Sequence, residues 1–261
     1  MFYSCTDPLL DSDFEAYIPP ESSITNSSIT NSEENGSEIT ISWQANNPFA
    51  LEFSYMLEPR EQEWSAWSTE TSAYYNYLDE NDYIFKVKSR YEAGSEQALP
   101  DSISFSIDNI AGPGLRFFPL YMKIYNASTF TMDIYAEEVM DIIGAEISCS
   151  YDPGFVVLDT TEISAGSFLT ASSGNPIIIK EYDVGAGNLI LTVATSLEDG
   201  ADLGGEASLS GSGSLIQLPF TAIAAGTFEI SFSNTSVYVQ EDEPETTVPY
   251  ISLTNATVVI E

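Results

Sequence analysis

Apolar and polar residues alternate one by one in segment after segment of this chain. Strict alternation places every second side chain on the same face of a β-strand. Turn-forming sequences at residues 46–48 and 79–82 separate such segments, and no helix-period stretch appears after residue 114. The pattern therefore predicts an all-β protein.

Two β-sandwich domains are expected. Residues 37–110 contain short, closely spaced segments, which is typical of an immunoglobulin-like sandwich of about seven strands. Four of these segments have apolar positions at Ile39, Ile41 and Trp43; Phe53, Tyr55 and Leu57; Tyr83, Phe85 and Val87; and Ile103, Phe105 and Ile107. Residues 111–116 read as a linker because they contain Ala-Gly-Pro-Gly, and residues 117–261 have the size of a jelly-roll sandwich.

One stretch of the second half carries the functional argument. Residues 142–153 read as a strand that runs into a tight turn at Asp152 and Pro153, where proline cannot continue the ladder. The expected inner face is Ala145, Ile147, Cys149 and Tyr151, and the expected outer face is Glu146, Ser148 and Ser150. An apolar inner face and a small, polar outer face indicate a sheet that is presented to a partner.

Charge and composition exclude several functions. The chain has 40 acidic and 7 basic residues, a net charge of -33 and no histidine. Nucleic acid and anionic membrane surfaces are excluded because phosphate binding needs a basic stripe. No nucleophile motif, phosphate loop or metal-ligand spacing is present, so the chain is interpreted as a non-enzyme. Cys149 is expected to be a small buried hydrophobe.

The first 36 residues are rich in Ser, Asn, Thr and Glu and are expected to form a flexible tether. Cys5 follows a short apolar stub, which resembles the end of a bacterial lipoprotein signal. That resemblance implies lipidation of Cys5 and attachment to a membrane by the tail alone. The alternative is an arbitrary start of the chain.

The run from Tyr77 to Lys88, followed by Gly94, resembles the corner and penultimate strand of fibronectin type III-like domains. With Trp64-Ser65 and Trp67-Ser68 upstream, the domain is closest to the triple-tyrosine variety. The resemblance implies that Tyr83 packs at a corner against the core and that this domain is a spacer.

Three of the basic residues, Lys86, Lys88 and Arg90, fall on one outward face. They could form a basic stripe for an acidic ligand. The alternative, which we favour, is cross-strand pairing with Glu52 and Glu58.

Residues 117–261 resemble a cohesin domain. The resemblance rests on the order of several motifs: Tyr151-Asp152-Pro153, Val156-Val157-Leu158, residues 162–168, a Gly/Ser/Asp loop at 198–214, Leu218-Pro219-Phe220-Thr221-Ala222, and residues 225–232. Cohesins are receptor modules that bind dockerins in cellulosome-type assemblies, so the resemblance implies docking of a dockerin-like protein partner. It also implies that an acid on the strand before the Tyr-Asp-Pro turn takes part.

The candidate partner-binding residues are Glu146, Ser148, Ser150, Tyr182, Asp183 and Glu241. Asp152 and Pro153 are instead interpreted as structural, because an Asp can bond to its own backbone two residues on. No cofactor is expected. Calcium stays an open alternative at residues 198–202 and 241–243, although neither stretch has the spacing of a calcium loop.

The resulting hypothesis is an extracellular scaffolding protein, tethered to a cell surface, whose second domain binds a protein partner. One alternative is a carbohydrate-binding module of a surface polysaccharide-utilisation system, with Tyr121, Tyr125 and Tyr135 as a stacking platform. The other is a structural subunit of a surface fibre, which would self-associate through sheet edges or the N-terminal tail.

Overall fold

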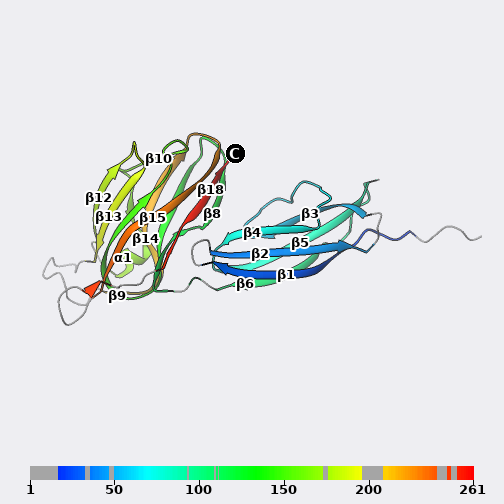
Figure 1. Cartoon of the computed structure of the whole chain (residues 1–261), viewed down its shortest axis with the longest axis horizontal. Coiled ribbons are helices and arrows are strands. Elements are labelled where there is room, and N and C mark those ends of the chain that lie inside the picture. The colour runs from blue at the N-terminus through cyan, green and yellow to red at the C-terminus, as the bar shows by residue number, and fades with distance from the viewer. Residues whose placement is uncertain are drawn as a thin grey trace, which may run out of the picture. The chain divides into compact units, whose positions relative to one another are not determined.

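The computed structural model describes residues 17–32, 36–46, 50–92, 94–108, 110, 112–172, 176–195, 208–239, 246–247 and 252–261. Within them the chain forms eighteen strands and one helix, α1 (Ser167–Ser172), so the predicted all-β class is confirmed (Figure 1). In these ranges no helix has the length and hydropathy that a membrane crossing requires.

The chain divides into two compact units. The first comprises Ile41–Ala73, Tyr83–Ser104 and the described part of the chain up to Ser27. The second comprises Ser28–Thr40, Tyr74–Asp82 and Phe105–Glu261.

Two three-stranded sheets come from the amino-terminal part of the chain. One has the order β1 (Ser22–Ser32), β2 (Gly36–Ala45), β4 (Ser72–Leu78), and the other has the order β3 (Ala50–Glu58), β5 (Asn81–Tyr91), β6 (Asp101–Ile107). The Trp43 ring of β2 lies with its centroid 5.1 Å from that of Tyr55 on β3 and 5.5 Å from that of Phe85 on β5. The two sheets therefore pack face to face around an aromatic cluster.

Strand β1 lies within the stretch that was expected to be a tether. Its sequence has only two isoleucines among eleven residues, so it lacks the alternation of apolar and polar residues from which a strand is predicted. Hydrogen bonds tie it down instead: the Ile24 N–H donates to Asp101 Oδ2 at 2.7 Å, and the Ser22 hydroxyl donates to the Val87 carbonyl at 3.0 Å. Cys5 lies outside the described residues.

The outward basic residues of β5 are paired with acids of the same unit. Lys86 Nζ lies 2.7 Å from Glu58 Oε1, and Arg90 Nε lies 2.7 Å from Glu52 Oε2, as the cross-strand interpretation predicts. Lys88 pairs instead with Glu96, at 3.1 Å.

The carboxy-terminal part of the chain forms one continuous system of strands. Its members are β7 (Gly114–Phe118), β8 (Tyr121–Ile124), β9 (Thr129–Ser150), β10 (Val156–Leu158), β11 (Ser164–Ala165), β12 (Ile177–Asp183), β13 (Asn188–Ala194), β14 (Leu209–Ala222), β15 (Gly226–Val239), β16 (Thr246–Thr247), β17 (Ser252–Thr254) and β18 (Ala256–Ile260). The order β10-β14-β9-β15-β18-β8 runs through it, with β12 and β13 attached to β9.

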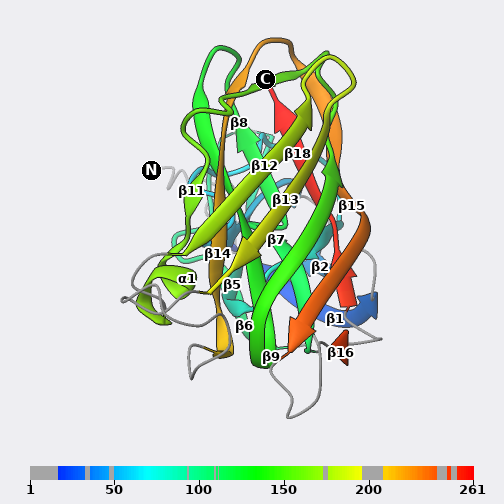
Figure 2. The ribbon, with the colours of Figure 1, turned by 90° about the vertical axis from the view of Figure 1, so that its left-hand side faces the viewer.

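Strand β9 links two layers because it changes partners at Ile142. Before this residue it pairs with β14 and β7, and after it with β13 and β15. Figure 2 shows β12, β13, β9 and β15 side by side toward the viewer, with β14 behind them.

The change of partners follows a local distortion of β9. Glu138 and Asp141 have positive φ angles of 46° and 51°, and the opposite segment of β14 is irregular. Their N–H groups, which leave the regular ladder, donate to the hydroxyls of Ser212 and Ser210 at 2.9 Å each. Such an irregularity bends a strand and aims its continuation in a new direction.

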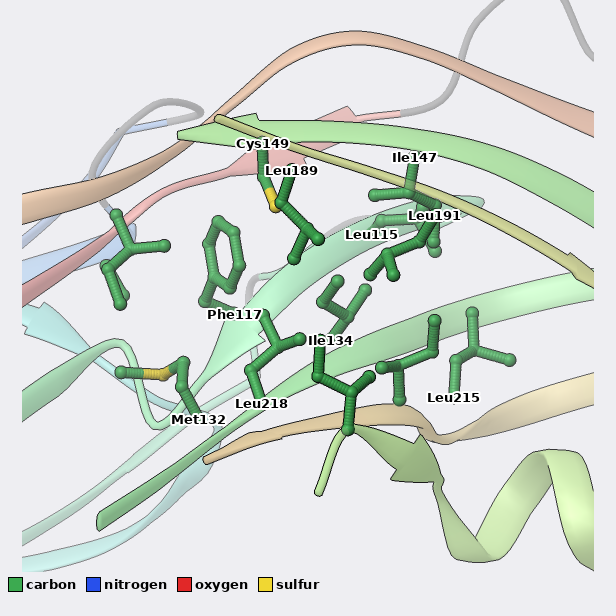
Figure 3. Packing of buried hydrophobic residues seen from close by; sticks show 14 of the residues in the cluster. Leu115, Phe117, Met132, Ile134, Ile147, Cys149, Leu189, Leu191, Leu215 and Leu218 are labelled. Atoms are coloured by element: carbon green, nitrogen blue, oxygen red, sulfur yellow. The ribbon is translucent and has the colours of Figure 1, made fainter. Parts of the chain in front are cut away.

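A single apolar core lies between the two layers (Figure 3). Ile147 and Cys149 of β9 point into it from one side, with Leu189 of β13, and Phe117 and Leu218 approach from the other elements. Burying one such large side chain stabilises the fold by about 1.5–3 kcal/mol. This packing fixes which face of β9 is left outside.

Candidate functional site

The second half of β9 presents one face to the core and the other to solvent. Ala145, Ile147 and Cys149 are buried, whereas Glu146 is exposed and Ser148 is half-buried. The predicted alternation is therefore confirmed. Because neighbouring strands share this alternation, the outward residues of β12, β13, β9 and β15 form one continuous surface, called here the docking face.

The strand register fixes which residues of the docking face are neighbours. Directly opposite residues point to the same side of an antiparallel sheet. The three rows read, from β12 to β15: Ile179, Thr192, Glu146 and Ser236; then Glu181, Ile190 and Ser148; then Asp183, Asn188, Ser150 and Ser231.

Three isoleucines form the apolar part of the docking face. Ile177, Ile179 and Ile190 expose 41%, 55% and 39% of their surface, although apolar side chains of this size are usually buried. Ile177 and Ile179 lie on the edge strand β12 and Ile190 lies on the next strand, with Thr192 and Ser148 beside them and Glu146 farther in on β9. Apolar groups bordered by hydroxyls and carboxylates are common at protein–protein interfaces.

Two tight turns hold one end of the docking face. Asp152 Oδ1 accepts a hydrogen bond from the Gly154 N–H at 2.8 Å, which confirms that Asp152 fixes the turn after β9. The Tyr151 N–H donates to the carbonyl of Gly187 at 2.9 Å and so ties this turn to the one between β12 and β13. Ser150 and Ser231 share a hydrogen bond of 3.1 Å between their hydroxyls.

The structure brings four of the candidate binding residues together and separates the others. Glu146, Ser148 and Ser150 lie on the docking face, and Asp183 lies at the end of the Ser150 row. Tyr182 is opposite the buried Leu189, so it belongs to the other side of β12. Glu241 lies outside the described residues.

The described residues offer no group of three or more Asp, Glu, Cys or His side chains that could hold a metal ion. The stretches considered for calcium, 198–202 and 241–243, lie outside the described residues. Cys149 offers no nucleophile, because burial raises the pKa of its thiol from 9.0 to about 12.

The three tyrosines considered for sugar stacking differ in their surroundings. Tyr135 is engaged within the protein: the Arg116 guanidinium lies 4.4 Å from its ring centroid, and the Phe118 ring lies 5.7 Å away. Tyr125 is exposed, and Tyr121 is half-buried on β8.

The exposed isoleucines are the residues that reading the sequence missed. The alternation of Leu189, Leu191 and Val193 left Ile190 on the outward side and could have identified it. Ile177 and Ile179 gave no such signal, because Ile178 between them makes the run continuously apolar.

No protein-family model matches this chain, and no curated protein matches it. Solved structures of cohesin domains are similar to part of it. A non-cellulosomal cohesin from the hyperthermophilic archaeon Archaeoglobus fulgidus has a TM-score of 0.44 and 13% identity, and the match covers 57% of this chain and 90% of that one.

Two further similar structures come from Acetivibrio cellulolyticus. A type II cohesin domain from its cellulosome has a TM-score of 0.46 and 16% identity, with 56% of this chain and 94% of that one covered. The sixth cohesin of its scaffoldin B, in complex with a Cel5 dockerin mutant, has a TM-score of 0.45 and 20% identity, with 58% and 100% covered.

Proposed function

We propose that the second sandwich is a cohesin-like receptor module that docks a folded protein partner of the dockerin class on its docking face. The single observation that carries this proposal is the cluster of exposed isoleucines on an otherwise regular sheet surface. The order of the sequence motifs from Tyr151 to Phe232 favours the same module. Fold alone does not determine function, so the surface is the stronger argument.

The chemistry of the docking face suits a protein rather than a small substrate. It is a sheet surface with apolar groups on β12 and β13, at Ile179 and Ile190, and with hydroxyls and a carboxylate alongside, at Thr192, Ser148 and Glu146. Truncating the central apolar residues of such a surface usually costs the most affinity. The acidic field of the chain would speed encounter with a basic partner.

The rest of the chain is proposed to be a non-catalytic, extracellular scaffold. In this proposal residues 37–110 are a fibronectin type III-like spacer, and a lipid on Cys5 holds the chain at a cell surface. The burial of Tyr83, at 4% exposure, fits the packed corner that this interpretation requires. The stretch 111–116, which was expected to be a linker, runs into β7, which begins at Gly114. Mass spectrometry of the native protein tests the lipid: an unmodified chain that retains Met1 contradicts it.

A pull-down tests the docking proposal. The full chain is immobilised as wild type, as Glu146→Arg and as Val157→Ala, and is offered a panel of dockerin modules. Val157 is a matched control because it is 52% exposed but lies on β10, away from the docking face. We expect the wild type and Val157→Ala to retain the same dockerin and Glu146→Arg to lose most of it.

Equal recovery by all three forms would remove Glu146 from the site. Failure of every dockerin to bind, with a polysaccharide as the only captured species in a parallel glycan screen, would overturn the docking proposal in favour of a carbohydrate-binding module.

A further inference from the structure

The outer edge of β12 is a second surface with the properties of a binding site. β12 pairs with β13 over all seven residues from Ile177 to Asp183, with no irregularity in register. Among the residues that the structure describes, β12 has no other strand partner. A strand edge presents a row of backbone donors and acceptors that another strand can use.

The hydrogen-bond pattern of β13 shows which of its residues bond to β12. The Tyr151 N–H donates to the carbonyl of Gly187, and the Thr195 N–H donates to the carbonyl of Ile143, both at 2.9 Å. Residues 187 and 195 thus direct their backbone groups toward β9. Because the direction alternates along an antiparallel strand, the even-numbered residues of β13 direct theirs toward β12.

The partners of those even-numbered residues are residues 177, 179, 181 and 183 of β12. The backbone N–H and C=O groups of the remaining residues, Ile178, Lys180 and Tyr182, therefore point to the open edge. They are spaced two residues apart, which is the spacing at which an added antiparallel strand bonds.

Two of the devices that usually blunt a strand edge are absent from β12: it has no bulge, and no proline lies within it. Charged residues, a third device, are present. Lys180 is turned inward, where its Nζ donates to the carbonyl of Ile163 at 2.8 Å, and Glu181 and Asp183 are exposed. The two carboxylates disfavour an acidic added strand and favour a basic one.

Side chains along the edge define what an added strand would need. Ile177 and Ile179 are exposed on the outer side of one half of β12, and Glu181 and Asp183 are exposed on the same side of the other half. A complementary strand therefore has apolar residues opposite the first pair and lysine or arginine opposite the second.

A second copy of this chain is poorly suited to supply such a strand. Only 7 residues of the chain are basic, against a net charge of -33. Five of them form ion pairs with carboxylates of their own chain, namely Lys86, Lys88, Arg90, Arg116 and Lys123. Lys180 bonds to the carbonyls of Thr160 and Ile163, and Arg60 also has an interaction within the chain. Charge complementarity therefore favours a different and more basic chain as the occupant.

We propose that the outer edge of β12 binds an extended segment of a basic protein as an added antiparallel strand. Main-chain bonds to Ile178, Lys180 and Tyr182 supply the affinity, and the apolar and acidic halves of the edge supply the direction and the specificity. This site shares the side chains of Ile177, Ile179, Glu181 and Asp183 with the docking face. It differs from the docking face because its main-chain bonds form with the backbone at the rim of the sheet.

The test uses the full chain and a synthetic peptide, acetyl-Lys-Thr-Lys-Glu-Val-Thr-Ile-amide, which places its lysines opposite Asp183 and Glu181. The control peptide exchanges the charges, as acetyl-Glu-Thr-Glu-Lys-Val-Thr-Ile-amide. Amide hydrogen exchange is followed by NMR. We expect the first peptide at saturation to slow exchange at Ile178, Lys180 and Tyr182 at least tenfold, and the control peptide to bind at least tenfold more weakly.

A pair of variants at Tyr182 distinguishes the contribution of its backbone N–H to peptide binding from that of its side chain. Tyr182→Pro removes an N–H that β13 does not use and should weaken peptide binding at least tenfold. Tyr182→Ala retains the N–H and should weaken it less than threefold. The wild-type measurement with the two peptides stands whether or not the proline variant folds.

Three outcomes would overturn the proposal: no protection of the three amides by the peptide, equal binding of the two peptides, or protection of the same amides by self-association in the absence of peptide. None of them bears on the docking face, which is tested with a folded partner and with Ile190 and Glu146.

Discussion

The Ser212 hydroxyl donates a hydrogen bond of 2.6 Å to Glu137 Oε1, and the same hydroxyl accepts the N–H of Glu138 at 2.9 Å. Glu137 is a buried carboxylate that also pairs with Arg116 Nε at 3.0 Å. This arrangement lies where β9 leaves one layer for the other. Ser212 of β14 thus provides a hydrogen-bond partner both for the Glu137 carboxylate and for the Glu138 N–H, at the bend that sets the direction of the second half of β9.

Replacing Ser212 by alanine should therefore lower the free energy of unfolding by about 1–2 kcal/mol, because a buried carboxylate and a backbone N–H each lose a partner. Urea denaturation of the full chain measures it. Ser208→Ala is the matched control: the Ser208 hydroxyl makes an exposed bond of 3.3 Å to Asp141, so its loss should cost less than about 0.5 kcal/mol. Equal effects of the two changes would show that Ser212 does not support the bend.

The turn between β12 and β13 should tolerate alanine at one glycine and not at the other. Gly187 has a φ of +70°, and a Cβ there would overlap the Tyr151 carbonyl. We expect Gly187→Ala to cost about 2 kcal/mol or more of unfolding free energy, from strain and overlap together.

Gly185 provides the comparison in the same turn. A Cβ there would meet only Asp183 Oδ1, at 3.4 Å, which is an ordinary contact. Gly185→Ala should change the unfolding free energy by less than about 0.5 kcal/mol. Chemical denaturation of both variants measures these changes in unfolding free energy. A Gly187→Ala variant as stable as the wild type would contradict the described geometry of the turn.

The inner and outer faces of β9 could be predicted from the sequence because they depend only on local alternation. The neighbours of Glu146 could not, since the row that joins it to Thr192 and Ile179 depends on how β13 and β12 pair. The face of β12 to which Tyr182 belongs could not be predicted either, because it also depends on how β12 pairs with β13. Its alternation is masked by the run Ile177-Ile178-Ile179, so only the pairing with Leu189 reveals it.

Residues 142–153 were expected to form a strand of their own, but in the structure the strand part of that stretch continues the alternating residues 130–136, and β9 is one strand of 22 residues. Glu137, Glu138 and Asp141, which lie between these two stretches, interrupt the alternation of apolar residues and suggest a break between two strands. Hydroxyls from Ser210 and Ser212, some seventy residues away in sequence, replace the missing ladder bonds. Contacts between such distant residues leave no local pattern. Helix α1, with six residues, is also too short to show a helical period.

The buried thiol of Cys149 should make the protein less stable at alkaline pH. Burial raises its pKa from 9.0 to about 12, so between these values the unfolded chain releases a proton that the folded chain retains. The free energy of unfolding therefore falls as the pH rises through this window, by up to about 1.4 kcal/mol per pH unit. The contribution is fully present below pH 9.

Denaturation from pH 8 to pH 11 of the wild type and of Cys149→Ala isolates this contribution, because the other ionisable groups are common to both. We expect the stability difference between the two proteins to shrink as the pH rises. Parallel pH profiles would contradict the assignment. Native Cys149 should also resist iodoacetamide at pH 8 and react only when the protein is unfolded.

Ile190 should matter for binding and little for folding. It lies in the middle row of the docking face between Glu181 and Ser148, and its side chain is 39% exposed. The stability of Ile190→Ala should stay within about 1 kcal/mol of the wild type. Its affinity for a docked partner should fall at least tenfold, as expected for a central apolar contact.

The most direct test of the docking face is the dissociation constant of one dockerin module, measured by calorimetry against the wild type, Ile190→Ala and Val157→Ala. Our account predicts a loss of at least tenfold for Ile190→Ala and an unchanged constant for Val157→Ala. An unchanged constant for Ile190→Ala, or an equal loss for Val157→Ala, would contradict it.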